Sequence, residues 1–200
     1  RRLPPGQFHA FLSHSQRYGA DQVASIKYLM ERAIQNLRCF LDVDTLTNVD
    51  EELSGDGVQV LHKHVTNSKC LCLFLTEEVF SRFWIIEELK SALEHNVDVC
   101  LIRETDARHG GKTLEAIKAD CPDLLRSSLF SKNDEIVDWH RDLHHKTVSM
   151  LKLTQRLIVC DDADRWADAP PQLFLPGAII EKRFAQPVLP AGCKFHCYST

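Results

Sequence analysis

Short apolar runs and amphipathic stretches alternate along this chain. Apolar runs of strand length occupy residues 8–13, 39–43, 70–76, 97–103 and 136–139. Apolar positions at helical spacing occupy 20–37, 58–65, the stretch between 81 and 96, 112–119 and 140–157. This alternation predicts an α/β fold of the flavodoxin-like (Rossmann-like) type, in which helices flank a five-stranded parallel sheet.

The passage from the third strand into the third helix is the most informative part of this pattern. Residues 70–76 form an unbroken apolar run, which predicts a strand that helices cover on both faces. Ser81 has the residue type of a helix N-cap, and Asn96 has the type that ends a helix in a left-handed conformation. We therefore expect a helix of about three to four turns between them.

Two adjacent acids on this helix fall in different environments. At about 100° of rotation per residue, the apolar residues form one arc that faces the sheet. Glu88 borders this arc, where its carboxylate can face a cleft beside the core, whereas Glu87 is predicted to be solvated. Trp84 lies one turn before Glu88 on the same side, so an aromatic ring and an acid form the wall of a candidate site.

The end of the chain differs from the rest in composition. Five of the eight prolines lie between Pro170 and Pro190, and acidic residues cluster at 161–168. We therefore divide the chain into a domain at 1–158 and a Pro-rich, irregular C-terminal extension or linker at 159–200. The first residue is arginine rather than methionine, so we expect the sequence to be a segment of a longer polypeptide.

Composition and charge exclude two classes of function. The hydrophobic fraction of 44% is enough for a normal core, and the net charge is -4. No Lys/Arg block stands out, so we expect no nucleic-acid partner. No apolar run approaches the roughly 20 residues that span a bilayer, so we expect no membrane insertion in this segment.

The cysteines indicate a reducing compartment. Cys39, Cys70, Cys72 and Cys100 lie in or beside apolar strand runs, where a free thiol behaves as a small hydrophobic group. This placement favours a cytoplasmic protein over a secreted disulfide framework. Potential ligands lie close together at 193–197, but no second pair follows at zinc-site spacing, so we expect an ordinary tail and no metal site.

The predicted topology brings several polar residues to one edge of the sheet. Ligands of open parallel sheets bind outside the carboxyl ends of the strands, where the strand order reverses. Those ends supply Ser13, His14 and Asp42, and the helix that bears Trp84 and Glu88 begins near the same edge. The resulting cleft is polar and acidic with one aromatic ring, which suits a ligand with a cationic part better than a bare phosphate.

Other motifs give weaker signals. Ser13 and His14 are neighbours on a strand, so their side chains point to opposite faces and do not form a nucleophile and base pair. The sequence HRDLHH at 140–145 lacks the glutamate of the HExxH zinc motif, and the GGKT at 110–113 lacks the first glycine of a phosphate loop. A response-regulator receiver domain needs an acidic pair at the end of the first strand. This chain has Ser13 and His14 there instead, so it does not match that class.

Three segments resemble the sequence boxes of TIR domains, the Toll/interleukin-1 receptor homology family. FHAFLSHS at 8–15 resembles the first box, and CFLDVDTL at 39–46 resembles the second strand and the start of the BB loop. SRFWIIEEL at 81–89 resembles the box S-x-W-C-x-x-E-L. The resemblance spans about 8–157 with the order and spacing of the elements intact, and it implies the TIR fold and a role in immune or cell-death signalling.

The resemblance also implies an enzymatic activity. In enzymatic members of the family, the glutamate four residues after the tryptophan is catalytic, and this position is Glu88 here. The implied function is an NAD+ hydrolase that cleaves the nicotinamide–ribose bond and yields nicotinamide with ADP-ribose or a cyclic ADP-ribose. NAD+ would be the substrate, and no cofactor is implied. The implied substrate-binding residues are Trp84, Ser13, His14, Asp42 and Arg17.

The sequence departs from the family pattern in three places. Ile85 replaces the usual cysteine, and Ser15 and Gln16 stand where some enzymatic relatives have arginines, with Arg17 beside them. The loop at 47–57 is longer than usual and lacks the proline that animal receptor and adaptor versions use to engage partners. The alternative is a non-enzymatic TIR scaffold that acts through homotypic TIR–TIR assembly. The acid at position 88 favours the enzyme.

Overall fold

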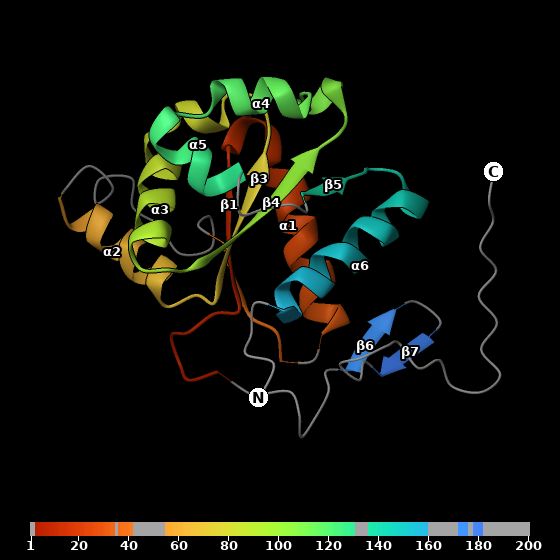
Figure 1. Ribbon diagram of the computed structural model, residues 1–200. Coiled ribbons are helices and arrows are strands. Elements are labelled where there is room, and N and C mark those ends of the chain that lie inside the picture. Colours follow the sequence, from red (N-terminus) through yellow and green to blue (C-terminus); the bar gives the residue numbers. More distant parts are fainter. Residues whose placement is uncertain are drawn as a thin grey trace.

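A parallel sheet forms the centre of the molecule. The computed structural model describes residues 3–34, 36–41, 55–130, 136–159, 172–175 and 178–181. Within these ranges, five strands form one sheet in the order β2-β1-β3-β4-β5 (Figure 1). They are β1 (Ala10–His14), β2 (Cys39–Leu41), β3 (Cys70–Leu75), β4 (Asp98–Glu104) and β5 (Val137–Trp139). The predicted flavodoxin-like sheet is confirmed.

Helices cover both faces of this sheet. They are α1 (Gln16–Ala33), α2 (Gly55–Thr66), α3 (Phe83–Glu94), α4 (Leu114–Asp120), α5 (Asp123–Phe130) and α6 (Leu143–Val159), with short 3-10 turns η2 (Val79–Ser81) and η3 (Ala107–His109). Helices α1 and α6 pack on one face, and α2, α3 and α5 pack on the other (Figure 1). Because successive strand side chains point to opposite faces, Phe11 packs under α3 whereas Leu12 packs under α1.

Helix α1 begins four residues earlier than the sequence predicts. The polar stretch at 14–19 reads as a turn because it contains a glycine, but the structure places Gln16 at the start of the helix and Ser15 at its N-cap. Gly19 lies where the helix approaches the sheet closely: a Cβ atom there would lie 3.1 Å from both His14 Cβ and Phe74 Cδ1. The glycine therefore permits close packing instead of ending the helix.

The start of α3 also differs from the prediction. Ser81 does not cap this helix, because it belongs to η2 and its hydroxyl donates to the Glu78 carbonyl at 2.7 Å. The N-cap position is Arg82. At the other end, Asn96 has φ 54°, so its predicted left-handed conformation is confirmed.

Helix α5 was absent from the sequence prediction. The chain begins a new helix at Asp123, directly after Pro122. Proline has no N–H to donate and a backbone angle that suits the first turn of a helix, so it can precede a helix as easily as it ends one. The short α4 and α5 together cover the carboxyl edge and one face of the sheet (Figure 1).

Buried thiols form part of the core. In the described ranges, five cysteines are buried and form no disulfide bond: Cys39, Cys70, Cys72, Cys100 and Cys121. Cys72 pairs with Cys100 on the neighbouring strand, and hydrogen bonding with the thiols of Cys100 and Cys70, together with burial, raises the pKa of Cys72. Burial likewise raises the pKa of Cys39. These thiols therefore act as small hydrophobic groups, as the sequence predicts.

Two strands are described in the proposed extension. Strands β6 (Gln172–Leu175) and β7 (Ala178–Glu181) pair as an antiparallel hairpin within 159–200. Across the residues that the structure describes, no helix combines the length and the apolar character that crossing a membrane requires.

Candidate functional site

A pocket opens at the carboxyl edge of the sheet, where the strand order reverses between β1 and β3. It has a volume of about 490 Å³, which lies in the range of small-molecule sites. We call it the Glu88 pocket. It is lined by Leu12, Ser13, His14, Ser15, Gln16, Arg17, Arg82, Trp84, Ile85 and Glu88. The chain thus places its pocket at the position where open α/β sheets bind ligands.

The Glu88 side chain is built into the wall of this pocket. It comes from α3 and is only 4% exposed, because it lies between the turns of Ile85 and Ala92, which pack on the sheet. The hydroxyl of Ser13 donates a hydrogen bond to Glu88 Oε2. A buried carboxylate with a hydroxyl donor has a fixed orientation, which is what electrostatic catalysis requires.

The neighbouring acid has a different environment. Glu87 forms an ion pair with Lys90 at 2.7 Å, and its side chain is 17% exposed. The prediction that Glu87 is solvated is therefore wrong, because the lysine one turn later covers it. The predicted difference between the two acids remains, since Glu88 lines the pocket and Glu87 does not.

Ser13 and His14 point to opposite faces of β1, as the sequence predicts. Ser13 faces α3 and Glu88, whereas His14 packs against Gly19 of α1. Within the described residues, Nε2 of His14 is buried and has no hydrogen-bond partner. Burial lowers the pKa of His14, so the imidazole is neutral at physiological pH. The pocket lining therefore includes a neutral histidine on the opposite face of β1 from the buried acid.

Aromatic rings form another part of the wall. Trp84 is half-buried and lines the pocket one turn before Glu88. The ring of Phe83 meets it edge to face, with centroids 5.2 Å apart, and Phe83 itself is 61% exposed. The predicted neighbourhood of an aromatic ring and an acid is thus present in the structure.

Two arginines lie at the pocket, and one of them was not predicted. Arg17 lies in the first turn of α1, and Arg82 lies at the N-cap of α3. The sequence-based prediction assigns Arg82 no role. Its position two residues before Trp84, a predicted pocket residue, could have indicated that it lies at the pocket. Both guanidinium groups bind Glu78.

Comparison with known proteins identifies the fold. No family model matches the chain, and no curated protein sequence matches it. The TIR domain of the Toll-related receptor TRR-2 from Hydra magnipapillata matches with a TM-score of 0.51, at 12% sequence identity, over 76% of this chain and 99% of that one. The chain has the TIR fold.

Two further TIR structures are similar. A metazoan TIR-STING receptor from C. gigas, solved in complex with 2′,3′-cGAMP, has a TM-score of 0.49 and 13% identity, over 76% of this chain and 41% of that one. The TIR domains of the activated Roq1 resistosome, which directly recognises the effector XopQ, have a TM-score of 0.48 and 16% identity, over 74% and 98% of the two chains.

Some of the predicted TIR-type residues lie outside the described residues. Asp42 is one of these, and so is most of the acidic loop that follows it. The cysteines at 193–197 are also outside.

Among the described residues of this TIR fold, no group of three or more His, Cys, Asp or Glu side chains could hold a metal ion. His145 instead bonds to Asp142 at 2.8 Å.

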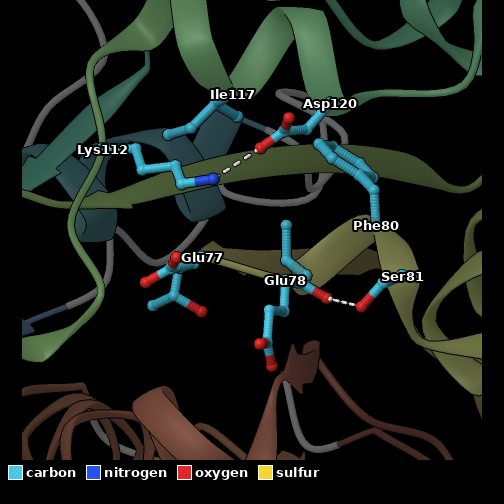
Figure 2. Close-up of a pocket in the computed structure, with 9 residues that line it drawn as sticks. Glu77, Glu78, Phe80, Ser81, Lys112, Ile117 and Asp120 are labelled. Atoms are coloured by element: carbon cyan, nitrogen blue, oxygen red, sulfur yellow. Dashed lines mark hydrogen bonds and ion pairs between the residues drawn. The ribbon is translucent and has the colours of Figure 1, made fainter.

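This TIR fold has a second pocket, whose lining residues are shown in Figure 2. It has a volume of about 300 Å³ and lies between the turn after β3 and helix α4. We call it the Lys112 pocket. Nζ of Lys112 donates to Asp120 at 2.8 Å, so its cation is already paired. Glu78 connects the two pockets, because it lines the Lys112 pocket and its carboxylate binds both arginines that line the Glu88 pocket.

Proposed function

We propose that this TIR-fold protein hydrolyses the nicotinamide–ribose bond of NAD+, with Glu88 as the catalytic acidic residue. The observation that supports the proposal most strongly is the position of the Glu88 carboxylate: it is 4% exposed, accepts a hydrogen bond from Ser13 and lines a pocket at the strand reversal. A carboxylate is costly to bury, so its presence in a cleft wall favours a functional role over a structural one.

The chemistry follows from the charge that develops on the ribose. As the bond breaks, its electron pair leaves with the nicotinamide nitrogen, and positive charge builds on the anomeric carbon and the ring oxygen. Glu88 would stabilise this oxocarbenium-like state through its negative charge and would contact the ribose hydroxyls. Water then attacks the anomeric carbon and loses a proton, which gives ADP-ribose. Attack by a group of the same substrate would give a cyclic ADP-ribose instead.

Other pocket residues would bind the substrate. The nicotinamide ring of NAD+ is cationic before cleavage, and the half-buried ring of Trp84 offers an aromatic surface for it. Ser13 would hold the Glu88 carboxylate in place, and neutral His14 and Arg17 also line the pocket. We assign Asp42 a substrate-binding role from the sequence alone.

A second candidate function is a scaffold that assembles through copies of the same domain. Its support is a set of exposed apolar side chains on α1 and α6, which pack beside each other on one face of the sheet. These side chains are Tyr28, Leu143 and Val148. Exposed apolar groups favour association with a partner. Assembly and catalysis are compatible, and we propose cytoplasmic signalling as their common setting because the described cysteines form no disulfide bond.

The test is the release of nicotinamide by the purified chain. We expect chromatography to detect nicotinamide and either ADP-ribose or a cyclic isomer after incubation with NAD+. The protein is assayed both in dilute solution and clustered on beads, because assembly can complete a site. Absence of nicotinamide under both conditions would contradict the enzyme and favour the scaffold.

A further inference from the structure

Two arginines and one glutamate form a charged group at the Glu88 pocket. Arg17 comes from α1 and Arg82 from the start of α3, and both line the pocket. Glu78 accepts hydrogen bonds from Nη1 of Arg17 at 3.3 Å and from Nη2 of Arg82 at 2.9 Å. One carboxylate therefore joins two cations that belong to different elements of the fold.

The backbone of Glu78 adopts an unusual conformation at this position. Its φ is 62°, which lies in the left-handed region that few residues other than glycine adopt. The carbonyl of Glu78 accepts hydrogen bonds from the Ser81 hydroxyl at 2.7 Å and the Ser81 amide at 3.1 Å, which closes the turn into η2. The side chain points away from Lys112 and Asp120 (Figure 2). Backbone strain of this kind often occurs at functional sites.

Arg17 has a second contact that limits its orientation. Its guanidinium carbon lies 5.0 Å above the centre of the Tyr18 ring. The Tyr18 ring is itself held in place, because it packs closely against Gly110. A Cβ atom at Gly110 would lie 2.8 Å from Cγ of Tyr18. Arg17 is therefore held between an aromatic ring and a carboxylate, although its side chain is 62% exposed.

The charge and spacing of this group suit a phosphate ligand. Two guanidinium groups and one carboxylate leave a net positive charge, and each guanidinium keeps further N–H donors that match phosphate oxygens. Arg82 and Glu88 are six residues apart on α3, which corresponds to a rise of roughly 9 Å along the helix. The positive group therefore lies a short distance from the acid along the same pocket.

We propose that Arg82, together with Arg17, binds the diphosphate group of a dinucleotide whose glycosidic bond lies at Glu88, and that Glu78 positions both arginines. This inference rests on the proposed function and extends it to substrate choice. The pocket then distinguishes a dinucleotide from a nicotinamide nucleoside that has no phosphate. Glu78 is a positioning residue, because it reaches the substrate only through the arginines.

The first experiment measures kcat and KM for NAD+ and for nicotinamide riboside, which lacks the diphosphate. We expect Arg82→Gln to raise KM for NAD+ about tenfold, with little change in kcat, and to leave the kinetics with nicotinamide riboside unchanged. Arg32→Gln is the matched control, because Arg32 is an exposed arginine in the last turn of α1, at the other end of the helix from Arg17. An unchanged KM in Arg82→Gln would overturn the assignment.

The second variant separates positioning from folding. Glu78→Gly removes the carboxylate but relieves the left-handed backbone, so the melting temperature should stay the same or rise. We expect KM for NAD+ to rise several-fold in the same protein. A purely structural role for Glu78 predicts that both quantities change together or that KM stays constant, and either result would overturn the positioning role.

A binding measurement separates this inference from the proposed function. Calorimetry with ADP-ribose, which keeps the diphosphate and lacks nicotinamide, requires no cleavage. Weaker binding of ADP-ribose by Arg82→Gln supports the phosphate site even if NAD+ is not hydrolysed. Equal binding by the variant and the wild type overturns the phosphate site even if NAD+ is hydrolysed, and so does the absence of binding by the wild type.

Discussion

The Glu88 pocket and the Lys112 pocket both lie at the carboxyl edge of the same sheet, and both are lined by acidic and basic side chains. In the Lys112 pocket, the cation and Asp120 bind each other, and both side chains are partly exposed. In the Glu88 pocket, the acid is buried against the core and hydrogen-bonded by Ser13, and the arginines lie apart from it on Glu78.

The two pockets differ in whether their charged side chains are paired with each other or remain available to a ligand. An ion pair between partly exposed groups already satisfies both charges and contributes little energy. A buried acid that is separated from the cations can stabilise positive charge that develops on a substrate. The cations can at the same time bind a negatively charged group of that substrate. Only the Glu88 pocket separates its charges in this way. The same edge of the sheet thus offers one pocket suited to chemistry and one with self-paired charges.

The largest expected effect is on turnover. Glu88→Gln keeps the shape and the hydrogen bond from Ser13 but removes the negative charge, and we expect the rate of nicotinamide release to fall by at least about a hundredfold. Lys112→Gln breaks the ion pair of the neighbouring pocket, and we expect it to leave the rate within about twofold because exposed pairs contribute little.

A matched acid serves as the control for this comparison. Glu87→Gln removes a carboxylate at the adjacent position, where the acid is paired with Lys90, and we expect nearly normal turnover. Equal losses in Glu87→Gln and Glu88→Gln would contradict the special role of the Glu88 pocket.

Gly110 ends η3 and packs against Tyr18 of α1, and its substitution should destabilise the fold. A Cβ atom there would lie 2.8 Å from Cγ of Tyr18, and the glycine has φ 79°. We expect Gly110→Ala to lower the free energy of unfolding by about 2 to 3 kcal/mol, measured in urea. Gly6→Ala is the matched control, because Gly6 has φ 80° and no atom within 4 Å of a built Cβ.

The control isolates the steric part of this effect. Gly6→Ala introduces only the left-handed strain, which we expect to cost about 1 kcal/mol. If both variants lose the same stability, Tyr18 has moved aside without cost, and the proposed fixation of Arg17 by this ring is wrong.

Ser13→Ala tests the hydrogen bond inside the Glu88 pocket. The variant removes the hydroxyl that donates to the buried carboxylate, so Glu88 loses part of its orientation. We expect kcat to fall about tenfold, because a hydrogen bond to a charged group contributes about 1.5 kcal/mol or more. Ser81→Ala is a suitable comparison, since its hydroxyl bonds to a backbone carbonyl in the neighbouring pocket. A normal kcat in Ser13→Ala would show that other contacts suffice.

The smallest effect concerns the pH dependence of stability. Burial lowers the pKa of His14 below its ordinary value of 6.5, so the unfolded chain binds a proton before the folded one does. Stability is therefore complete above pH 6.5 and falls as the pH drops towards the pKa of the folded state. The slope for one histidine is at most about 1.4 kcal/mol per pH unit.

Urea unfolding between pH 5 and pH 8 measures this slope. We expect His14→Gln to reduce it, with a remainder from His64, whose pKa is also lowered by burial. His144→Gln, at an exposed position on α6, is the matched control. A wild-type slope in His14→Gln would contradict the burial of a neutral imidazole in the Glu88 pocket.

The sequence predicted the strands well because their burial is a local property. A strand covered on both faces is apolar throughout, so the run at 70–76 indicates β3 to within a residue. The position of Glu88 was also predictable, because a helical wheel depends only on spacing. The predicted meeting of Ser13 and Glu88 needed one further assumption, the parallel topology that brings β1 beside β3.

Features that depend on distant contacts were not predictable. The early start of α1 depends on the approach of Gly19 to Phe74 on another strand. The role of Arg82 depends on the left-handed turn at Glu78, whose carboxylate also reaches Arg17, 61 residues away in sequence. Residue types alone do not specify such a turn, because glutamate rarely adopts it.

The most direct test of the central claim is a structure of the Glu88→Gln variant soaked with NAD+. Loss of the charge should leave the substrate uncleaved in the pocket. We predict that NAD+ occupies the Glu88 pocket, with a ribose hydroxyl within about 3.2 Å of the side chain at position 88 and the nicotinamide ring against Trp84. Density for NAD+ in the Lys112 pocket, or with its nicotinamide–ribose bond remote from position 88, would contradict the account.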